Sequence, residues 1–317
     1  MWRYVVRRAV GAAIVLWLVS IFVFVAVRAL PGDAVLVKIG ESGRISEAQL
    51  DAARRELGLD DPVMIAYAKW AGGFVRGDLG DSVIQEGMSV NSRIRKALTP
   101  TLELSLLSAA IGLPLAIGLG VISGLRQDTW LDYPLRLAAI LSLSVPNFVI
   151  AVSALTFLSR RFAYAPPFGW VDLWDDPLHN LEILLLPVLI SGFSVSGTLM
   201  RMTRSSVLEV MRQDYVRTAR AKGLAARDVI WRHILRNALI SVTTLLGITV
   251  AFMLSGSVIM EVIFAIPGVG RLTLTAIQQR DYTQIMGNTM FFAAVVLISN
   301  LAVDMLYGVI DPRVKLR

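Results

Sequence analysis

Few side chains in this sequence could carry out chemistry. The chain has no cysteine, which excludes disulfides, thiolate metal sites and iron–sulfur clusters. Its two histidines, His179 and His233, lie too far apart in the sequence to predict a local metal cluster. It contains no HExxH motif, no pair of catalytic carboxylates and no GxxxxGK(S/T) loop for ATP. We therefore expect no catalytic, metal-binding or cofactor-binding residue in this chain.

Three carboxylates lie within or beside long apolar runs, namely Glu103, Glu261 and Asp304. A charge at membrane depth is a functional candidate by default. Each of the three stands near one end of its run, where water or a snorkelling arginine would reach it. The sequence lacks the series of buried carboxylates expected of a proton-driven carrier, which argues against ion coupling.

The most distinctive charged segment runs from residue 201 to residue 236, between two apolar runs. Apolar residues recur at Val207, Met211, Tyr215 and Ala219, a spacing that places them on one side of a helix. Gly223 suits the end of that helix, and a second helical pattern follows it. We predict two short amphipathic helices joined at Gly223, which present a charged face outside the bilayer; the alternative is a solvated basic loop that only fixes topology. The nine basic residues are Arg201, Arg204, Arg212, Arg217, Arg220, Lys222, Arg227, Arg232 and Arg236, against the acids Glu209, Asp214 and Asp228.

Composition indicates a membrane protein. Of the 317 residues 55% are hydrophobic and only 17% are charged, and the net charge is +7. Soluble domains average about 25% charged residues. The basic residues gather beside apolar runs, which favours a role in topology and contact with anionic lipid or a protein partner over binding of nucleic acid.

The apolar segments predict an all-α integral membrane protein with six transmembrane helices. Each segment is long enough to cross a hydrocarbon core of about 30 Å. We place the spans near residues 9–27, 101–125, 137–159, 181–200, 239–263 and 285–309.

Charge asymmetry between the loops predicts that both termini lie in the cytoplasm. Arg3, Arg7 and Arg8 precede the first span, and the segment 201–236 follows the fourth. We divide the chain into a cytoplasmic N-terminus (1–8), a first span (9–28), an extracytoplasmic domain (29–99), a five-helix core (100–310) with an inner loop (201–237), and a cytoplasmic tail (311–317). The extracytoplasmic domain is expected to be small and helical, with one helix over 46–57 and another after Pro62.

Spans two to five contain helix breakers, small residues and polar side chains. This pattern fits a bundle that lines a polar pathway and changes shape, but ordinary close packing requires the same small residues. Our candidates for the translocation path are Asn147, Ser194, Ser255 and Glu261.

The segment Tyr215–Gly223, with Arg232–Leu239 behind it, resembles the EAA loop of ABC importer permeases, in the version of the dipeptide/oligopeptide/nickel branch. Ala219 and Gly223 fall on the second alanine and the glycine of that motif. Arg217, Thr218 and Arg236 stand where the general motif has Glu, Ala and Pro, and such departures are usual in the peptide branch. Further matches run from one end of the chain to the other, at residues 28–33, 57–62, 77–80 and 311–313.

The resemblance implies a type I ABC importer transmembrane fold in a bacterial inner membrane. In that family the loop is a coupling helix that docks on a cytoplasmic ATPase. The resemblance also implies one or two ATPase subunits that hold ATP and Mg, a second, similar permease chain that forms a heterodimer with this one, and an extracytoplasmic solute-binding protein. Di- or oligopeptides are the expected substrates, and the alternatives are nickel, glutathione or other small solutes, which relatives use. The resemblance carries the ATPase contact onto Tyr215, Arg217, Thr218, Ala219, Arg220, Lys222, Gly223 and Leu224.

Two other classes of function remain open at this point. A self-sufficient secondary carrier or channel would explain the spans and the broken helices. It would leave the amphipathic inner loop unexplained, and the two halves show no convincing repeat. An intramembrane enzyme has no supporting motif.

Overall fold

The computed structural model describes residues 2–29, 61–85, 87–167, 169–255 and 258–310. Within these ranges the chain is helical, and the only β-type pairing is an isolated bridge between Asp81 and Ser89. The elements are α1 (Trp2–Arg28), α4 (Val63–Val75), α5 (Val90–Leu125), α6 (Asp132–Ser144), α7 (Asn147–Phe162), α8 (Pro177–Met211), α9 (Asp214–Ala221), α10 (Ala226–Asp228), the π-helix η1 (Val229–Leu235), α11 (Arg236–Ser255), α12 (Val258–Ile263), α13 (Val269–Gln279) and α14 (Tyr282–Ile310).

Four of the described helices are long and apolar enough to cross a membrane, or five if one bent pair is counted as a span. The four are Val5–Arg28, Val90–Leu125, Pro177–Met211 and Tyr282–Ala302. The fifth predicted span falls on α11 and α12, which are separate helices. Six spans with both termini inside therefore stay a prediction, while several apolar helical spans are confirmed.

The predicted third span is not one straight helix. It consists of α6 and α7, and the chain bends by 104° between these two helices. Pro146 explains the break, because its ring excludes the preceding residue from the α region and its nitrogen has no hydrogen to donate. Val145 accordingly has an extended backbone, with φ −97° and ψ 117°. The sequence indicated a helix breaker here but not a bend of this size.

The pair α5 and α8 forms the centre of the bundle, and glycines bring the two backbones together. A methyl group added at Gly112 would lie 2.7 Å from Cα of Gly192, and one at Gly120 would lie 2.6 Å from the carbonyl oxygen of Met200. Contacts this short exclude any larger side chain at these positions. For Gly112 and Gly120, close packing is thus the better interpretation than a polar pathway.

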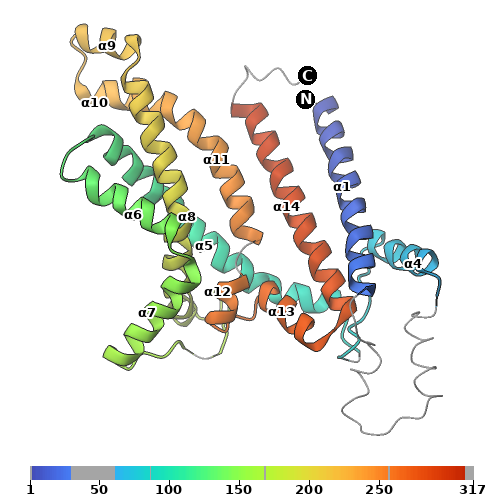
Figure 1. Cartoon of the computed structure of the whole chain (residues 1–317). Coiled ribbons are helices and arrows are strands. Elements are labelled where there is room, and N and C mark those ends of the chain that lie inside the picture. Colours follow the sequence, from blue (N-terminus) through green and yellow to red (C-terminus); the bar gives the residue numbers. More distant parts are fainter. Residues whose placement is uncertain (1, 30–60, 86, 168, 256–257, 311–317) are drawn as a thin grey trace.

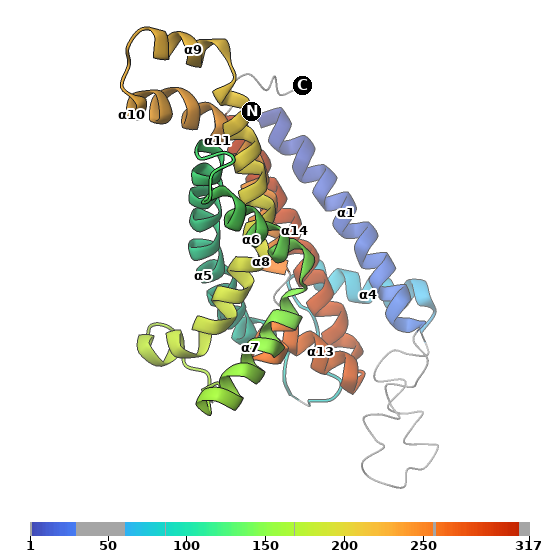
Figure 2. The same cartoon turned by 60° about the vertical axis from the view of Figure 1, so that its left-hand side comes forward.

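The remaining helices surround this pair (Figure 1). α6 and α11 pack on α8, and α14 lies between α11 and α1. The start of α1, the end of α14 and the α9–η1 segment gather at one end of the molecule, while α4, α12 and α13 lie toward the other (Figures 1 and 2). Large apolar side chains of α1, such as Trp17 and Phe22, are more than half exposed, as expected of a surface that faces lipid.

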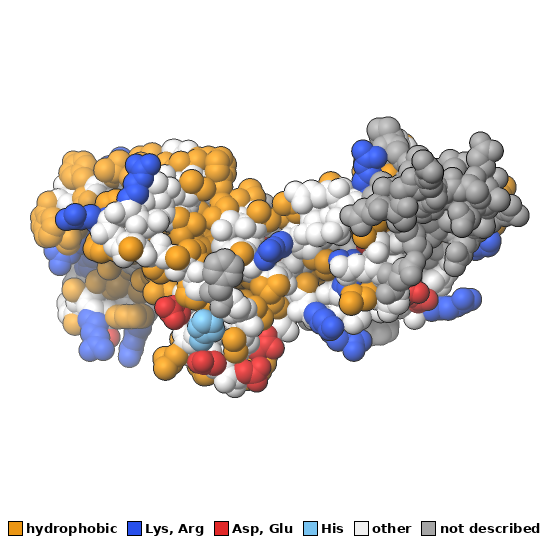
Figure 3. Space-filling model, turned by 90° about the horizontal axis from the view of Figure 1, so that it is seen from below, with side chains coloured by type: hydrophobic (Ala, Val, Ile, Leu, Met, Phe, Trp, Pro, Cys, Tyr) orange, Lys and Arg blue, Asp and Glu red, His pale blue; other side chains and the backbone are white. Residues whose placement is uncertain are grey.

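The described part of the segment predicted to be extracytoplasmic lies toward the end opposite α9. The predicted helix after Pro62 is confirmed as α4, whereas the predicted helix 46–57 lies outside the described residues. Tyr67 and Trp70 of α4 pack on Phe24 of α1, and the Tyr67 hydroxyl shares a hydrogen bond of 2.8 Å with Ser20. Seen from this end, most of the acidic side chains in view gather in one area, next to a broad apolar area (Figure 3).

Candidate functional site

Residues 212–235 form a hairpin that projects from one end of the bundle (Figures 1 and 2); we call it the basic hairpin. α8 runs up to it and ends at Met211, α9 forms its first arm, and α10 with η1 forms its second. The second arm continues directly into α11, and the first arm follows α8 after a break at residues 212–213.

An apolar cluster fastens the two arms to each other and to α8. Val216 and Ala219 of α9 are buried against Val229 and Ile234 of the second arm and against Val207 of α8. Burial of such side chains contributes about 1.5–3 kcal/mol each for residues of the size of valine or isoleucine. The hairpin therefore has its own core and is held in a fixed position on the bundle.

This arrangement corrects the prediction of one helical stripe through Val207, Met211, Tyr215 and Ala219. The helix is interrupted, because α8 ends at Met211 and the extended backbone of Gln213 (φ −70°, ψ 146°) starts a new helix at Asp214. An acidic residue in a first helical turn is favourable next to the positive end of the helix dipole. The interruption shifts the buried position from Tyr215, which is 43% exposed, to Val216, which is fully buried.

Gly223 reverses the chain between the arms, as the sequence predicted. Its φ is +77°, a conformation that glycine adopts without steric cost. The Gly223 nitrogen donates to the carbonyl of Arg220 at 3.0 Å, and the Leu224 nitrogen donates to that of Ala219 at 3.4 Å. A methyl group added at Gly223 would meet nothing within 4 Å, so the requirement for glycine comes from the backbone and not from crowding.

The outer surface of the hairpin combines basic and apolar side chains. Tyr215, Leu224 and Trp231 are exposed, and Trp231 exposes 65% of its surface. Arg217 pairs with Asp214 at 3.6 Å, and Arg232 pairs with Asp228 at 3.9 Å, both on the surface. Such exposed pairs are worth little, about 0–1 kcal/mol, so they leave the charges available to a partner. The predicted contact residues Arg217, Thr218, Arg220, Lys222 and Gly223 are also exposed.

Ala219 is the exception among the predicted contact residues. It is only 5% exposed and lies inside the apolar cluster of the hairpin. Its small size lets the two arms approach, which is a different role from touching a partner.

The π-helix at the base of the second arm was not predicted from the sequence. Seven residues, Val229–Leu235, have π-helical hydrogen bonding immediately before α11. Such segments are rare and are frequent at functional sites. Val229, Ile234 and Leu235 are buried in it while Trp231 is exposed.

The four candidates for a translocation path lie on four different helices. Asn147 is the first residue of α7, directly after the bend, and is partly exposed. Ser194 lies in α8, and its hydroxyl is buried without a hydrogen-bond partner among the described residues. The side chain of Ser255, at the end of α11, lies outside the description.

Glu261, the fourth candidate, is fully buried and does not line an open path. Its carboxylate accepts hydrogen bonds from Thr101 Oγ1 at 2.8 Å and from the nitrogen of Arg271 at 3.0 Å. Thr101 Oγ1 in turn accepts from the nitrogen of Val269 at 2.9 Å. Glu261 thus stabilises the start of α13 and joins it to α5 and α12, where the charge is favourable beside a helix N-terminus.

Glu103 is also buried, contrary to the expectation that water or an arginine would reach it. Only 7% of it is exposed, and its carboxylate accepts from Asn180 Nδ2 at 2.6 Å and from the nitrogen of Leu173 at 3.2 Å. It therefore fixes the loop before α8 to α5. The position of Asp304 was predicted correctly on the last helix, but its side chain lies outside the description.

Two buried ion pairs were missing from the sequence-based candidates. Asp132, at the start of α6, is fully buried, and Arg204 of α8 holds both of its oxygens, at 3.0 and 2.8 Å. Near the other end, the Arg93 guanidinium donates to Asp281, also fully buried, at 3.1 Å. The two residues of the first pair are 72 positions apart in the chain, and those of the second pair are 188 apart. At such separations the spacing of residues in the sequence does not predict a contact.

A bundle of apolar spans with a basic hairpin at one end fits a membrane transport subunit. Residues 116–316 match the family described as binding-protein-dependent transport system inner membrane component, and residues 1–86 match its N-terminal companion. The chain belongs to this family and is a multi-pass bacterial inner-membrane protein. Membership implies in general that ATPase and substrate-binding partners work with it.

Relatives of known name match along nearly the whole chain. A putative peptide permease protein of Brucella suis is 37% identical, over 99% of this chain and 99% of the relative. An oligopeptide transport system permease protein of Bacillus subtilis is 35% identical over 98% of this chain and 99% of its own length. A dipeptide transport system permease protein of the same species is 35% identical over 99% and 98%.

Solved structures confirm the fold. A chain of an amino acid ABC transporter superposes with a TM-score of 0.55 and 15% identity, covering 68% of this chain and 94% of that one. A chain of a methionine ABC transporter in an inward-facing conformation gives a TM-score of 0.51 with 13% identity, over 69% and 96%. The architecture is thus that of the transmembrane subunits of ABC importers.

Proposed function

We propose that this chain is the permease subunit of an ATP-driven importer of di- or oligopeptides. The observation that carries the proposal is the basic hairpin. It has a buried core that includes Val207 of α8, an exposed surface of basic and apolar side chains, and a second arm that continues into α11. The relatives with peptide, oligopeptide and dipeptide in their names support the substrate class.

The hairpin suits a mechanical role. A separate ATPase binds its outer surface, through the exposed residues Tyr215, Arg217, Arg220 and Leu224. Closure of the ATPase on ATP and Mg moves the hairpin, and its fixed core passes the displacement to α8 and α11. Binding can drive a change of conformation only if the contacts differ between the two states, so the ATPase must hold the hairpin differently before and after closure.

The proposed assembly has further subunits. A second, similar but different permease chain completes the pathway, one or two ATPase subunits carry out the hydrolysis, and an extracytoplasmic solute-binding protein delivers the peptide. This chain itself contributes no catalytic residue. No observation favours a self-sufficient carrier, because that function gives the basic hairpin nothing to do.

Reconstitution tests the proposal. Proteoliposomes that contain the complete assembly should take up a labelled tripeptide only when ATP and the solute-binding protein are both present. An assembly with a hydrolysis-deficient ATPase is the control and should not transport. Uptake by this chain alone along an ion gradient, or ATP-driven uptake that needs no partner ATPase, would refute the proposal.

Docking on the hairpin has a separate test. Replacing the exposed Tyr215 and Leu224 by alanine should reduce co-purification of the ATPase by about tenfold or more, because apolar side chains in an interface centre often contribute over 1–2 kcal/mol each. Leu178→Ala is the matched control, since Leu178 is 82% exposed at the start of α8, at the opposite end. Equal ATPase recovery with the wild type, the variant with alanine at Tyr215 and Leu224, and Leu178→Ala would exclude docking through these side chains.

A further inference from the structure

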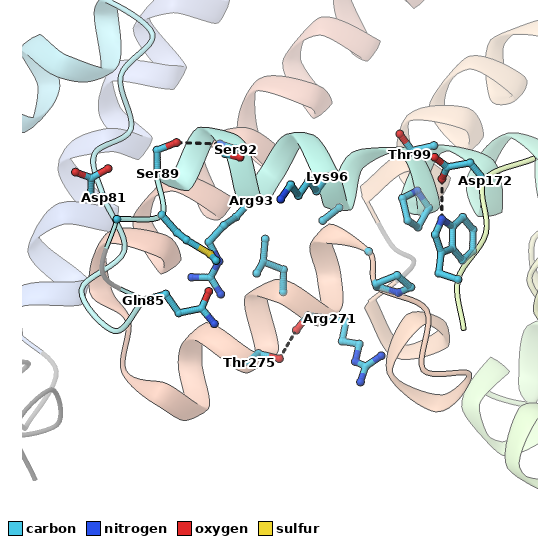
Figure 4. Close-up of a pocket in the computed structure, with 18 residues that line it drawn as sticks. Asp81, Gln85, Ser89, Ser92, Arg93, Lys96, Thr99, Asp172, Arg271 and Thr275 are labelled. Carbon is cyan, nitrogen blue, oxygen red and sulfur yellow. Dashed lines mark hydrogen bonds between the residues drawn. The ribbon is translucent and has the colours of Figure 1, made fainter. Parts of the chain in front are cut away.

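A cavity of about 840 Å³ opens between the first turns of α5 and the helix α13, at the end opposite the basic hairpin (Figure 4). Small-molecule sites in proteins measure about 300–1,000 Å³, so this one can hold a short peptide. Its walls carry charged side chains of both signs, and hydroxyl groups such as those of Ser92 and Thr275 lie between them. The cavity takes no part in the contacts of the hairpin.

Three cationic side chains line the cavity, but only two are available to a ligand. Arg93 is already neutralised, because its guanidinium donates to the buried Asp281 and to Ser82, each at 3.1 Å. Lys96 is exposed and makes no hydrogen bond or ion pair within the described ranges. Arg271 gives one guanidinium hydrogen bond to the carbonyl of Ala265, with no carboxylate bound to its side chain among the described residues. Figure 4 places Lys96 on α5 and Arg271 on the facing helix α13.

Two acidic side chains lie at the opposite ends of the cavity, Asp81 at one and Asp172 at the other (Figure 4). Asp172 accepts a hydrogen bond from Trp170 Nε1 at 2.8 Å. The cavity therefore has a cationic middle and anionic ends. A ligand with a carboxylate at one end and an ammonium group at the other satisfies both, whereas a segment with acidic charges alone would be repelled by the two aspartates.

A smaller cavity of about 220 Å³ adjoins the first and shares Trp170 and Pro267 with it. Its other walls are nearly all apolar and include Ile183, Phe264 and Ile266. Such a chamber suits an apolar side chain. A charged main site with an apolar annex fits an amino-acid chain better than it fits an inorganic anion.

We propose that this cavity receives the free peptide, with the C-terminal carboxylate bound to Lys96 and the amino end directed to an aspartate at the rim. The inference rests on the proposed function, since it assumes that peptides are the solute. It assigns to this chain a receiving site of its own in addition to recognition by an external binding protein.

Site-specific photo-crosslinking tests the proposal in the assembled transporter, reconstituted in lipid nanodiscs without the solute-binding protein. A photoreactive amino acid replaces Thr275, which lines the cavity, and in a control protein it replaces Leu178, which does not. The probes are radiolabelled trialanine with a free carboxylate and the same peptide as its C-terminal amide. We expect trialanine to be crosslinked at position 275 and not at 178, and the amide to be crosslinked about tenfold less, the loss typical of one charge-assisted hydrogen bond.

Variants of Lys96 test which side chain binds the carboxylate. Lys96→Gln should lower crosslinking of trialanine by about tenfold without further lowering that of the amide, and Lys96→Arg should restore it. Arg95→Gln is the matched control, because Arg95 lies on the same helix, is exposed and does not line the cavity. Equal crosslinking of acid and amide, or no effect of Lys96→Gln, would overturn the proposal.

Uptake by the complete wild-type assembly separates this proposal from the function on which it rests. ATP-driven uptake of trialanine without carboxylate-dependent crosslinking would overturn the receiving site alone. Carboxylate-dependent crosslinking without uptake of any peptide would support the site and refute the proposed function.

Discussion

Asp132 and Arg204 show how one buried pair of side chains fixes two helices near the hairpin end. Besides the two bonds from Arg204, the carboxylate accepts from Ser123 and from the nitrogen of Asp128, so all of its partners come from three neighbouring segments. Removal of one member of a buried pair leaves the other charge uncompensated, and this typically costs about 3–5 kcal/mol.

We therefore expect Asp132→Asn to lower the stability of the protein strongly. Arg204→Lys should also destabilise, although less, because an ammonium group cannot bind both oxygens in the planar geometry of a guanidinium. Thermal unfolding of the purified protein in detergent, followed by tryptophan fluorescence, measures both effects. Arg217→Lys, in an exposed pair, is the control and should change little. An Asp132→Asn protein as stable as wild type would show that the pair is not structural.

Gly223 gives a prediction that separates backbone strain from crowding. Because its φ is +77° and the space around it is empty, Gly223→Val should strain the turn by about 1–2 kcal/mol, whereas Gly223→Asn should be tolerated better. A cost of this size lowers the equilibrium constant for forming the turn by about 5–30-fold. We expect ATP-driven uptake to fall in that range for the valine variant while membrane insertion is unchanged.

The control for Gly223 lies at the other end of the molecule. Gly77 has φ +81° and equally empty surroundings, so Gly77→Val carries a similar backbone cost away from the hairpin. Recovery of the ATPase with the purified permease should fall for Gly223→Val and not for Gly77→Val. An equal loss for both would attribute the effect to general destabilisation.

At the scale of whole helices, two glycines of α5 give a paired prediction. Replacement by alanine should have opposite effects on stability at Gly112, which contacts α8, and at Gly118, which does not. Gly112→Ala should destabilise by about 1–3 kcal/mol, because the new methyl group would lie 2.7 Å from the backbone of Gly192. Gly118→Ala, on the same helix, should stabilise by about 0.5–1 kcal/mol, since nothing lies within 4 Å and alanine favours helix. Thermal unfolding of the two variants measures this difference, and stabilities that move in the same direction would contradict the close contact.

The helices also show which parts of the fold the sequence could predict. Hydropathy located the apolar segments, and Gly223 and Pro146 marked two chain breaks. The break between α8 and α9 was missed because the four-residue spacing continues across it, while the extended backbone of Gln213 interrupts the helix. The 104° bend at Pro146 depends on what α6 and α7 pack against, which a local pattern does not contain.

For the whole molecule, the arrangement predicts which ends face the two sides of the membrane. The chain has no cysteine, so single cysteines can be introduced without removing others. With the hairpin inside, Thr218→Cys should react with a membrane-impermeant maleimide only after the membrane is opened, and Leu178→Cys should react in intact spheroplasts. Both residues are exposed. Reaction of Thr218→Cys in intact cells would reverse the predicted topology.

The candidate site was predictable only in part, for reasons that also belong to the whole molecule. The exposed basic residues of the hairpin follow from a local charge pattern. The capping role of Glu261 depends on Thr101 and on the start of α13, which folding brings from distant parts of the chain. The receiving cavity likewise joins α5 to α13, and no run of sequence contains both of its walls.

The contact of bare backbones between α5 and α8 limits how this protein can move. Because no side chains separate the two backbones at the glycine contacts, the helices have little room to slide or rotate against each other. We therefore expect α5 and α8 to move together as one rigid body. A displacement of this pair at the hairpin end should then tilt the whole pair and move its opposite end as well. A hinge should therefore lie outside this pair, and we expect it at the bend between α6 and α7.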